Sequence, residues 1–330
     1  MKSFTPPKGL KNKHLQSILS STGPRQFFEK RRCKALINSS IPEIIVTPQN
    51  IKLAGCLSKT TKPRKGIAIL LHGWEGCTES LYMLSTGQAF LDDGYDVFRL
   101  NFRDHGGTQH LNEGLFNSML LEEVLEAVKY LAAKYGGQHN VLCGYSLGGN
   151  FCLRIANLAV AKELNIDQAI AVCPLLDPPT TMEALSNGLF IYEQYFVKRW
   201  KSSLSRKLNY HSYLDYKGKL NELKSLQQMN DFFIVNYTEF NTVNEYLKAY
   251  SLLGDTLQTL SIPTTIISTE DDPMIPASQL SQLYPSPFLS FDLQASGGHC
   301  AFIKNWKLES WVNERIIYHV QQQFIASEDF

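Results

Sequence analysis

The chain has 330 residues, a formal net charge of +1 at pH 7, and 44% hydrophobic residues. This length suits one large α/β domain or two smaller ones, and the balanced charge argues against nucleic-acid binding. No apolar run approaches the roughly 18 residues of a transmembrane helix, and residues 1–8 lack a signal-peptide stretch, so we expect a cytoplasmic protein without stable membrane insertion.

Strand-like and helix-like segments alternate through the first 177 residues, which indicates a parallel sheet covered on both faces. The apolar run 66–71 is typical of a strand buried on both sides. In chain order we expect an irregular extension over 1–40, edge strands over 43–47 and 51–57, a strand over 66–71, a helix near 79–92, a strand over 95–102, a helix over 121–132, a strand over 140–143, a helix over 149–158 and a strand over 169–173. The predicted fold class is α/β, with a mostly parallel, doubly wound sheet.

The alternation stops after residue 177 and resumes at a strand over 264–269, so residues 178–263 form an insertion in the core 1–177 and 264–330. The sequence of this insertion indicates mostly helices. We expect them to form a helical cap or lid that covers the carboxyl ends of the strands and shapes an apolar pocket. The alternative is a packed cover without substrate contact. Its aromatic residues are interleaved with basic ones that we interpret as a solvated face: Phe190, Tyr192, Tyr195, Phe196 and Trp200 with Lys198, Arg199, Lys201, Arg206 and Lys207.

Gly144-Tyr145-Ser146-Leu147-Gly148 follows a predicted strand and precedes a predicted helix. This Gly-x-Ser-x-Gly pattern in a strand–turn–helix context predicts a nucleophile elbow, with Ser146 exposed at the top of the sheet. The turn is so tight that side chains at Gly144 and Gly148 would collide with neighbouring backbone. A serine hydroxyl becomes nucleophilic only when a base takes its proton, so we expect a base on a loop later in the chain.

The acid and base of such a site follow the serine in chain order, and each is expected on a loop just past a strand. Asp272 follows the strand over 264–269 and precedes a helix expected over 276–284, while His299 follows a strand over 288–293. We therefore predict a Ser146–Asp272–His299 triad. Asp271 and Asp177 are alternative acids.

His72 and His105 are rival bases, although we expect His72 to order its own loop and His105 to form part of a tight turn. The three loop histidines, these two and His299, lack metal-ligand spacing, so no metal and no cofactor are expected. His72-Gly73 directly follows the buried strand over 66–71. Such a turn can aim a backbone N–H at a bound carbonyl, and we assign the oxyanion hole to the N–H groups of Trp74 and Leu147.

The seven cysteines are scattered and contain no CxxC pair. Their odd number and the missing export signal favour reduced thiols, most of them small buried hydrophobes. Cys77 and Cys300 are exceptions because both lie in predicted active-site loops, where a reactive role is an alternative to burial.

Together these motifs resemble the α/β-hydrolase superfamily, and a finer likeness is to its YheT-like branch of candidate bacterial esterases, which is related to ABHD-type lipases. The matching segments are Asn12–Leu19, which includes His14-Leu15-Gln16, together with 72–76, 102–103, 144–150, 271–273 and 297–299. The resemblance spans about residues 10–320 and implies an α/β-hydrolase fold and a carboxylic ester hydrolase. The chain departs from the family pattern at two places: Asp104-His105 follow Arg103, and Cys300-Ala301 follow His299. We do not expect this chain to have the membrane anchor of the eukaryotic relatives, so the resemblance does not imply lipid substrates.

The expected reaction is hydrolysis of a small-molecule ester, with an apolar acyl or alcohol part, through an acyl-enzyme intermediate. Two alternatives remain open. The same site could serve a thioesterase or acyltransferase, or the chain could be a non-catalytic binding protein on this fold, because fold does not fix function.

Overall fold

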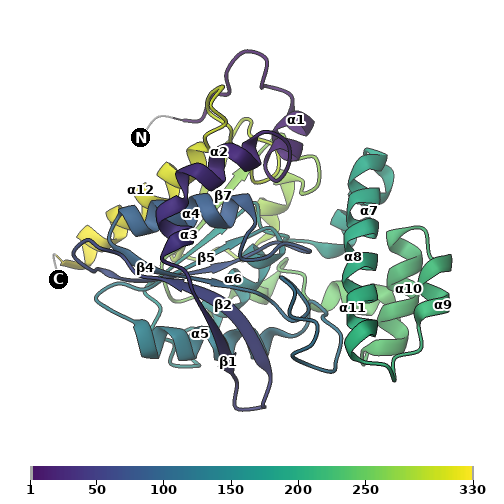
Figure 1. Cartoon of the computed structure of the whole chain (residues 1–330). Helices are drawn as coiled ribbons and strands as arrows, with labels where there is room; N and C mark the ends of the chain where they lie inside the picture. Colours follow the sequence, from purple (N-terminus) through teal and green to yellow (C-terminus); the bar gives the residue numbers. More distant parts are fainter. Residues whose placement is uncertain (1–2, 329–330) are drawn as a thin grey trace.

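An eight-stranded sheet forms the centre of the computed structural model, which describes residues 3–328 (Figure 1). The strand order is β1-β2-β4-β3-β5-β6-β7-β8. Strand β2 is antiparallel to both of its neighbours, β1 and β4, and all other neighbouring strands pair in parallel. The strands are β1 (Ile41–Val46), β2 (Lys52–Ser58), β3 (Gly66–Leu71), β4 (Tyr95–Leu100), β5 (Val141–Tyr145), β6 (Gln168–Val172), β7 (Thr264–Thr269) and β8 (Leu289–Gln294). The predicted α/β class is confirmed.

Helices cover both faces of the sheet (Figure 1). On one face, α5 (Leu121–Tyr135) and α6 (Leu147–Asn157) bury their apolar stripes against the central strands. On the other face, α4 (Leu81–Asp92) and α12 (Trp311–Glu328) do the same. Because the central strands are buried on both sides, their sequences are continuous apolar runs rather than alternating ones.

The N-terminal segment, expected to be irregular or weakly helical, has no helix over 3–12 and three short helices over 13–38. It forms α1 (Lys13–Leu19), α2 (Arg25–Arg32) and α3 (Lys34–Asn38). The Asn12 side chain caps α1 by accepting hydrogen bonds from the N–H groups of His14 and Leu15. The Arg25 side chain is fully buried and donates to the carbonyls of Ser20 and Leu308. Tertiary contacts, rather than hydrophobic periodicity, hold these short helices.

Five helices between β6 and β7 gather at one end of the molecule (green in Figure 1). They are α7 (Pro178–Asn187), α8 (Phe190–Tyr210), α9 (Lys217–Glu222), α10 (Leu226–Tyr237) and α11 (Val243–Ala249). An apolar cluster from α7 to α10 packs onto Met274 and Ile275 of the loop after β7. The division into a core and a separate cap stays a prediction.

Short 3-10 helices complete the chain: η1 (Asp255–Leu257) before β7 and η2 (Ala277–Gln282) where a helix over 276–284 was expected. Within residues 3–328, no helix has both the length and the apolar character that crossing a membrane requires.

Candidate active site

Ser146 occupies the turn between β5 and α6 in a strained backbone conformation, with φ 53° and ψ −117°. Its N–H donates to the Val172 carbonyl at 3.0 Å, which ties the turn to the next strand. A Cβ at Gly144 would lie 2.1 Å from the Gly148 carbonyl oxygen, and one at Gly148 would lie 2.4 Å from the Leu71 carbonyl oxygen. Backbone packs so closely around Ser146 that only glycine fits on either side.

His299 lies on the loop between β8 and α12, and its Nδ1 is 2.7 Å from Oδ2 of Asp272. The other carboxylate oxygen of Asp272 accepts the N–H groups of Met274 and Ile275 at 2.9 and 3.0 Å. The backbone of its own loop therefore fixes the carboxylate. Burial disfavours a charged imidazole, but the Asp272 carboxylate and the neighbouring Cys300 together outweigh it and raise the pKa of His299 well above its ordinary value.

The two alternative acids have other partners. Asp271 Oδ1 accepts the Gly298 N–H at 2.9 Å, which shapes the histidine loop without contact to the imidazole. Asp177 caps α7, and its carboxylate bonds to Thr180 and Ser251. Within residues 3–328, Asp272 is thus the acidic residue that the structure joins to His299.

Ser146 and His299 line the same two cavities. In the described part of the chain no hydrogen bond joins the Ser146 hydroxyl to the imidazole. Nucleophile–base contacts are often long in ligand-free enzymes and shorten when substrate binds, so the arrangement is compatible with proton transfer.

The loop after β3 approaches Ser146 closely, since a Cβ at Gly73 would lie 3.2 Å from the Ser146 Cβ. His72 orders this loop: its Nδ1 donates to the Gly73 carbonyl and its Nε2 accepts the Phe102 N–H. Among residues 3–328 the N–H groups of Trp74 and Leu147 have no acceptor within the protein. Both donors are therefore free to bind a ligand oxygen.

Of the rival bases, His72 and His105 are almost fully buried, and burial lowers the pKa of His105 to about 4. The ring nitrogens of His105 are engaged by the Arg103 carbonyl and the Glu75 N–H. Both histidines support loops beside the site, and neither lines the two cavities that contain Ser146.

A cavity of about 810 Å³ extends from Ser146 beneath the helices between β6 and β7. Most of the lining is apolar or aromatic and comes from α7, α8, α10, α11 and nearby loops: Trp74, Leu175, Met182, Leu185, Phe196, Trp200, Ile234, Tyr246, Leu247, Met274 and Ile275. The Trp74 ring stacks on Phe196 with centroids 5.0 Å apart, which joins the loop after β3 to α8.

The sequence pattern of a family described as "Serine aminopeptidase, S33" matches residues 62–286, more than half of the chain. The chain belongs to this hydrolase family. Over 331 aligned residues this hydrolase is 25% identical to a protein of Escherichia coli (strain K12) named "Putative esterase YheT". The alignment covers 95% of this chain and 91% of the relative. The expected YheT-like resemblance is thereby confirmed.

Solved structures share the fold of this hydrolase. The esterase Pf2001 of Pyrococcus furiosus superposes with a TM-score of 0.58 at 14% identity, covering 89% of this chain and 95% of that one. Est1E of Butyrivibrio proteoclasticus with bound ferulic acid superposes with a TM-score of 0.54 at 16% identity, and the match covers 86% of this chain and 99% of Est1E. At these identities the likeness concerns the fold alone.

Helix α1 supports the histidine loop of the hydrolase, a role that the sequence reasoning did not assign. The Ser17 hydroxyl accepts the His299 N–H at 2.9 Å. Buried Gln16 accepts the Ile303 N–H and donates to the Ile303 carbonyl, at 2.8 and 3.2 Å. On the same helix, His14 Nδ1 lies 3.0 Å from the Tyr192 hydroxyl on α8. The sequence signal was the His-Leu-Gln segment itself, which had only a family resemblance to explain it.

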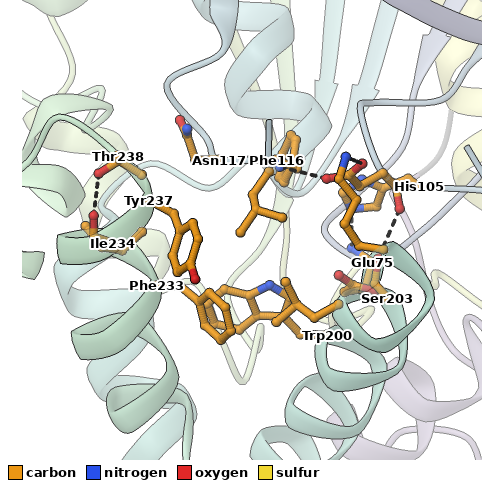
Figure 2. A pocket seen from close by; sticks show the side chains of 14 residues that line it. Glu75, His105, Phe116, Asn117, Trp200, Ser203, Phe233, Ile234, Tyr237 and Thr238 are labelled. Carbon is orange, nitrogen blue, oxygen red and sulfur yellow. Dashed lines mark hydrogen bonds and ion pairs between the residues drawn. The ribbon is translucent and has the colours of Figure 1, made fainter. Parts of the chain in front are cut away.

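A second cavity, of about 490 Å³, adjoins the first and shares Phe116, Asn117, Trp200 and Ile234 with it. Figure 2 shows aromatic rings, among them Trp200 and Phe233, on one side and Glu75, His105 and Ser203 on the other. Burial raises the pKa of Glu75 to about 7, against the opposing influence of Arg199 and Arg206.

Lys207 lines this second cavity and departs from the expectation that the basic residues of the insertion form a solvated face, whereas Lys198, Arg199 and Arg206 are exposed as expected. It is fully buried on α8, and its Nζ is 2.7 Å from Oδ1 of Asp104. It also donates to the carbonyls of Asn112 and Gly114. The interior face of α8 therefore carries a charge that a buried carboxylate and two backbone carbonyls stabilise.

Proposed function

We propose that this hydrolase cleaves carboxylic esters by two-step acyl transfer, with Ser146 as nucleophile, His299 as general base and Asp272 as the acid that orients it. The observation that carries the proposal is the 2.7 Å Asp272–His299 hydrogen bond, in a site whose imidazole shares both cavities with the strained serine. This combination of nucleophile, base and orienting group is the signature of covalent acyl transfer.

In the first step the Ser146 oxygen attacks the ester carbonyl while His299 Nε2 takes the hydroxyl proton. The free N–H groups of Trp74 and Leu147 would bind the oxyanion, each worth about 3–4 kcal/mol of transition-state stabilisation. His299 then returns the proton to the leaving alcohol. Water attacks the acyl-enzyme with the same base assistance, which releases the carboxylic acid and restores the serine.

The substrate that fits the lining has an apolar acyl or alcohol part, because aromatic and aliphatic side chains surround the cavity next to Ser146. In this proposal residues 178–263 act as the cap that supplies much of the lining. Met182 of α7 lies in that wall, so Met182→Ala should lengthen the preferred acyl chain by vacating side-chain volume. A panel of p-nitrophenyl esters graded by acyl length measures that optimum.

The decisive experiment compares wild type and Ser146→Ala for turnover of a short p-nitrophenyl ester and for labelling by a fluorophosphonate probe. We expect both signals to vanish in the folded variant. Equal turnover in both proteins would refute the serine mechanism. Wild type that neither reacts with the probe nor turns over esters would favour a binding protein, and faster turnover of acyl-thioesters than of esters would favour a thioesterase.

A further inference from the structure

Two cysteines that are far apart in the sequence meet the imidazole of His299. Cys173 directly follows β6, and Cys300 follows His299 on the loop between β8 and α12. The two Sγ atoms and a ring nitrogen of His299 all lie within 4.8 Å of one another. The Cys300 N–H also donates to the Cys173 sulfur at 3.4 Å, so the cysteines are in direct contact.

The spacing of these atoms is close to that of a tetrahedral zinc site. With Zn–S near 2.3 Å and Zn–N near 2.0–2.1 Å, ligand atoms on a tetrahedron lie about 3.5–3.8 Å apart. Side-chain movements of about 1 Å would therefore bring the three atoms onto one ion. Two thiolates and one imidazole form a soft ligand set that suits Zn²⁺ and leaves a fourth position for water.

The surroundings supply the other parts of such a site. Asp272 already holds Nδ1 of His299, so Nε2 is the nitrogen available to an ion. A carboxylate behind a ligating histidine is the usual outer partner in zinc sites. His299 and Cys300 both line the cavity that lies between Ser146, Ser17 of α1 and Tyr192 of α8, which gives a cation a route to the cluster.

We propose that Cys173, Cys300 and His299 form a Zn²⁺ site that inhibits this hydrolase. Binding displaces to solvent the protons carried by the two thiols and by Nε2 of His299, and it occupies this nitrogen, the atom that must accept the Ser146 proton. Zinc binding and ester cleavage are then mutually exclusive. The inhibitory part rests on the proposed function, whereas the metal site itself does not.

Binding is tested with Co²⁺ as a spectroscopic probe on the reduced full-length protein. We expect thiolate-to-cobalt absorption in the near ultraviolet that saturates at one ion per chain and disappears when Zn²⁺ is added. Cys173→Ser and Cys300→Ser should each weaken binding by about 10-fold or more. Cys56→Ser is the matched control, because Cys56 lies on β2, which β4, β3 and β5 separate from β6, and it should bind as wild type does.

Wild-type protein without a thiolate band would overturn the site, and this measurement needs no variant to fold. A band that is unchanged in folded Cys173→Ser and Cys300→Ser would also overturn it. Inhibition is tested separately with Zn²⁺ on ester turnover, where we expect a loss that EDTA reverses and that needs about 10-fold more Zn²⁺ in Cys300→Ser. Cobalt binding with ester turnover indifferent to Zn²⁺ would refute the inhibitory role. A wild type without esterase activity would refute the proposed function but leave the cobalt result standing.

Discussion

Replacement of Asp272 by asparagine changes one atom at the centre of the proposed site. Oδ1 of the present carboxylate accepts the N–H groups of Met274 and Ile275, and an asparagine oxygen can keep both hydrogen bonds. The other oxygen, which faces His299 Nδ1 at 2.7 Å, becomes an NH₂ donor. Nδ1 must then act as acceptor, which moves the imidazole proton to Nε2 and blocks acceptance of the serine proton.

The expected loss is large and specific to the chemical step. In serine triads the wrong imidazole tautomer lowers kcat by about 10⁴-fold. At about 1.4 kcal/mol for each tenfold, this corresponds to roughly 5 kcal/mol of transition-state stabilisation. Asp272 lies behind His299 and is not among the residues that line the two cavities around Ser146, so KM should change little.

Steady-state kinetics on a p-nitrophenyl ester measure both parameters, with Asp271→Asn as the matched control. Among residues 3–328 the Asp271 side chain accepts only the Gly298 N–H, and asparagine can still do so, so this variant should stay within about 10-fold of wild type. The reasoning fails if Asp272→Asn retains kcat within 10-fold of wild type, or if the two variants lose equal activity.

Three further predictions concern stability and positioning. Lys207→Met leaves Asp104 buried without its cation, so the unfolding free energy in urea should fall by about 3–5 kcal/mol, and a change below 1 kcal/mol would contradict a buried ion pair. Hydrogen bonds from His319 and Arg315 outweigh burial and lower the pKa of Asp292 to about 2. The ionised Asp292 therefore stabilises the folded protein fully above pH 3.8, the ordinary pKa of this carboxyl group, and this contribution is lost as the pH falls through about 2. Urea midpoints of wild type and Asp292→Asn should therefore converge across this range, and a constant difference would refute the linkage. Ser17→Ala removes the acceptor of the His299 N–H and should lower kcat about 10-fold at unchanged KM, whereas equal kcat would exclude a positioning role.

The fold and the candidate triad were accessible from sequence because their signals are local. The alternation of elements determines a parallel sheet, and a parallel sheet brings loops at the ends of β5, β7 and β8 to one edge. Ser146 and His299 follow from that rule. The choice between Asp271 and Asp272 does not, because adjacent side chains on one loop point to different partners.

What the sequence could not provide depends on contacts between distant segments. Gln16 pairs with the backbone of Ile303, which lies 287 residues away, and no periodicity in α1 indicates it. Lys207 meets Asp104 across 103 residues, so its burial on α8 cannot be read from a mixed aromatic and basic segment. Sequence spacing likewise does not indicate that Cys173 and Cys300 lie together, because only the topology of the sheet brings them into contact.

The attachment of α8 constrains how the proposed cap can open. Lys207 fixes its C-terminal half to the Asp104 loop, and Arg199 holds its middle through the Glu75 carbonyl. Its first residues, Phe190 and Ile191, are 72% and 54% exposed. Opening should therefore be a tilt about the fixed C-terminal half, with the greatest travel at the α7–α8 junction. This tilt must break the hydrogen bond between Tyr192 of α8 and His14 of α1, so that an incoming ester passes between α8 and α1 rather than through the cavity lined by Glu75 and His105.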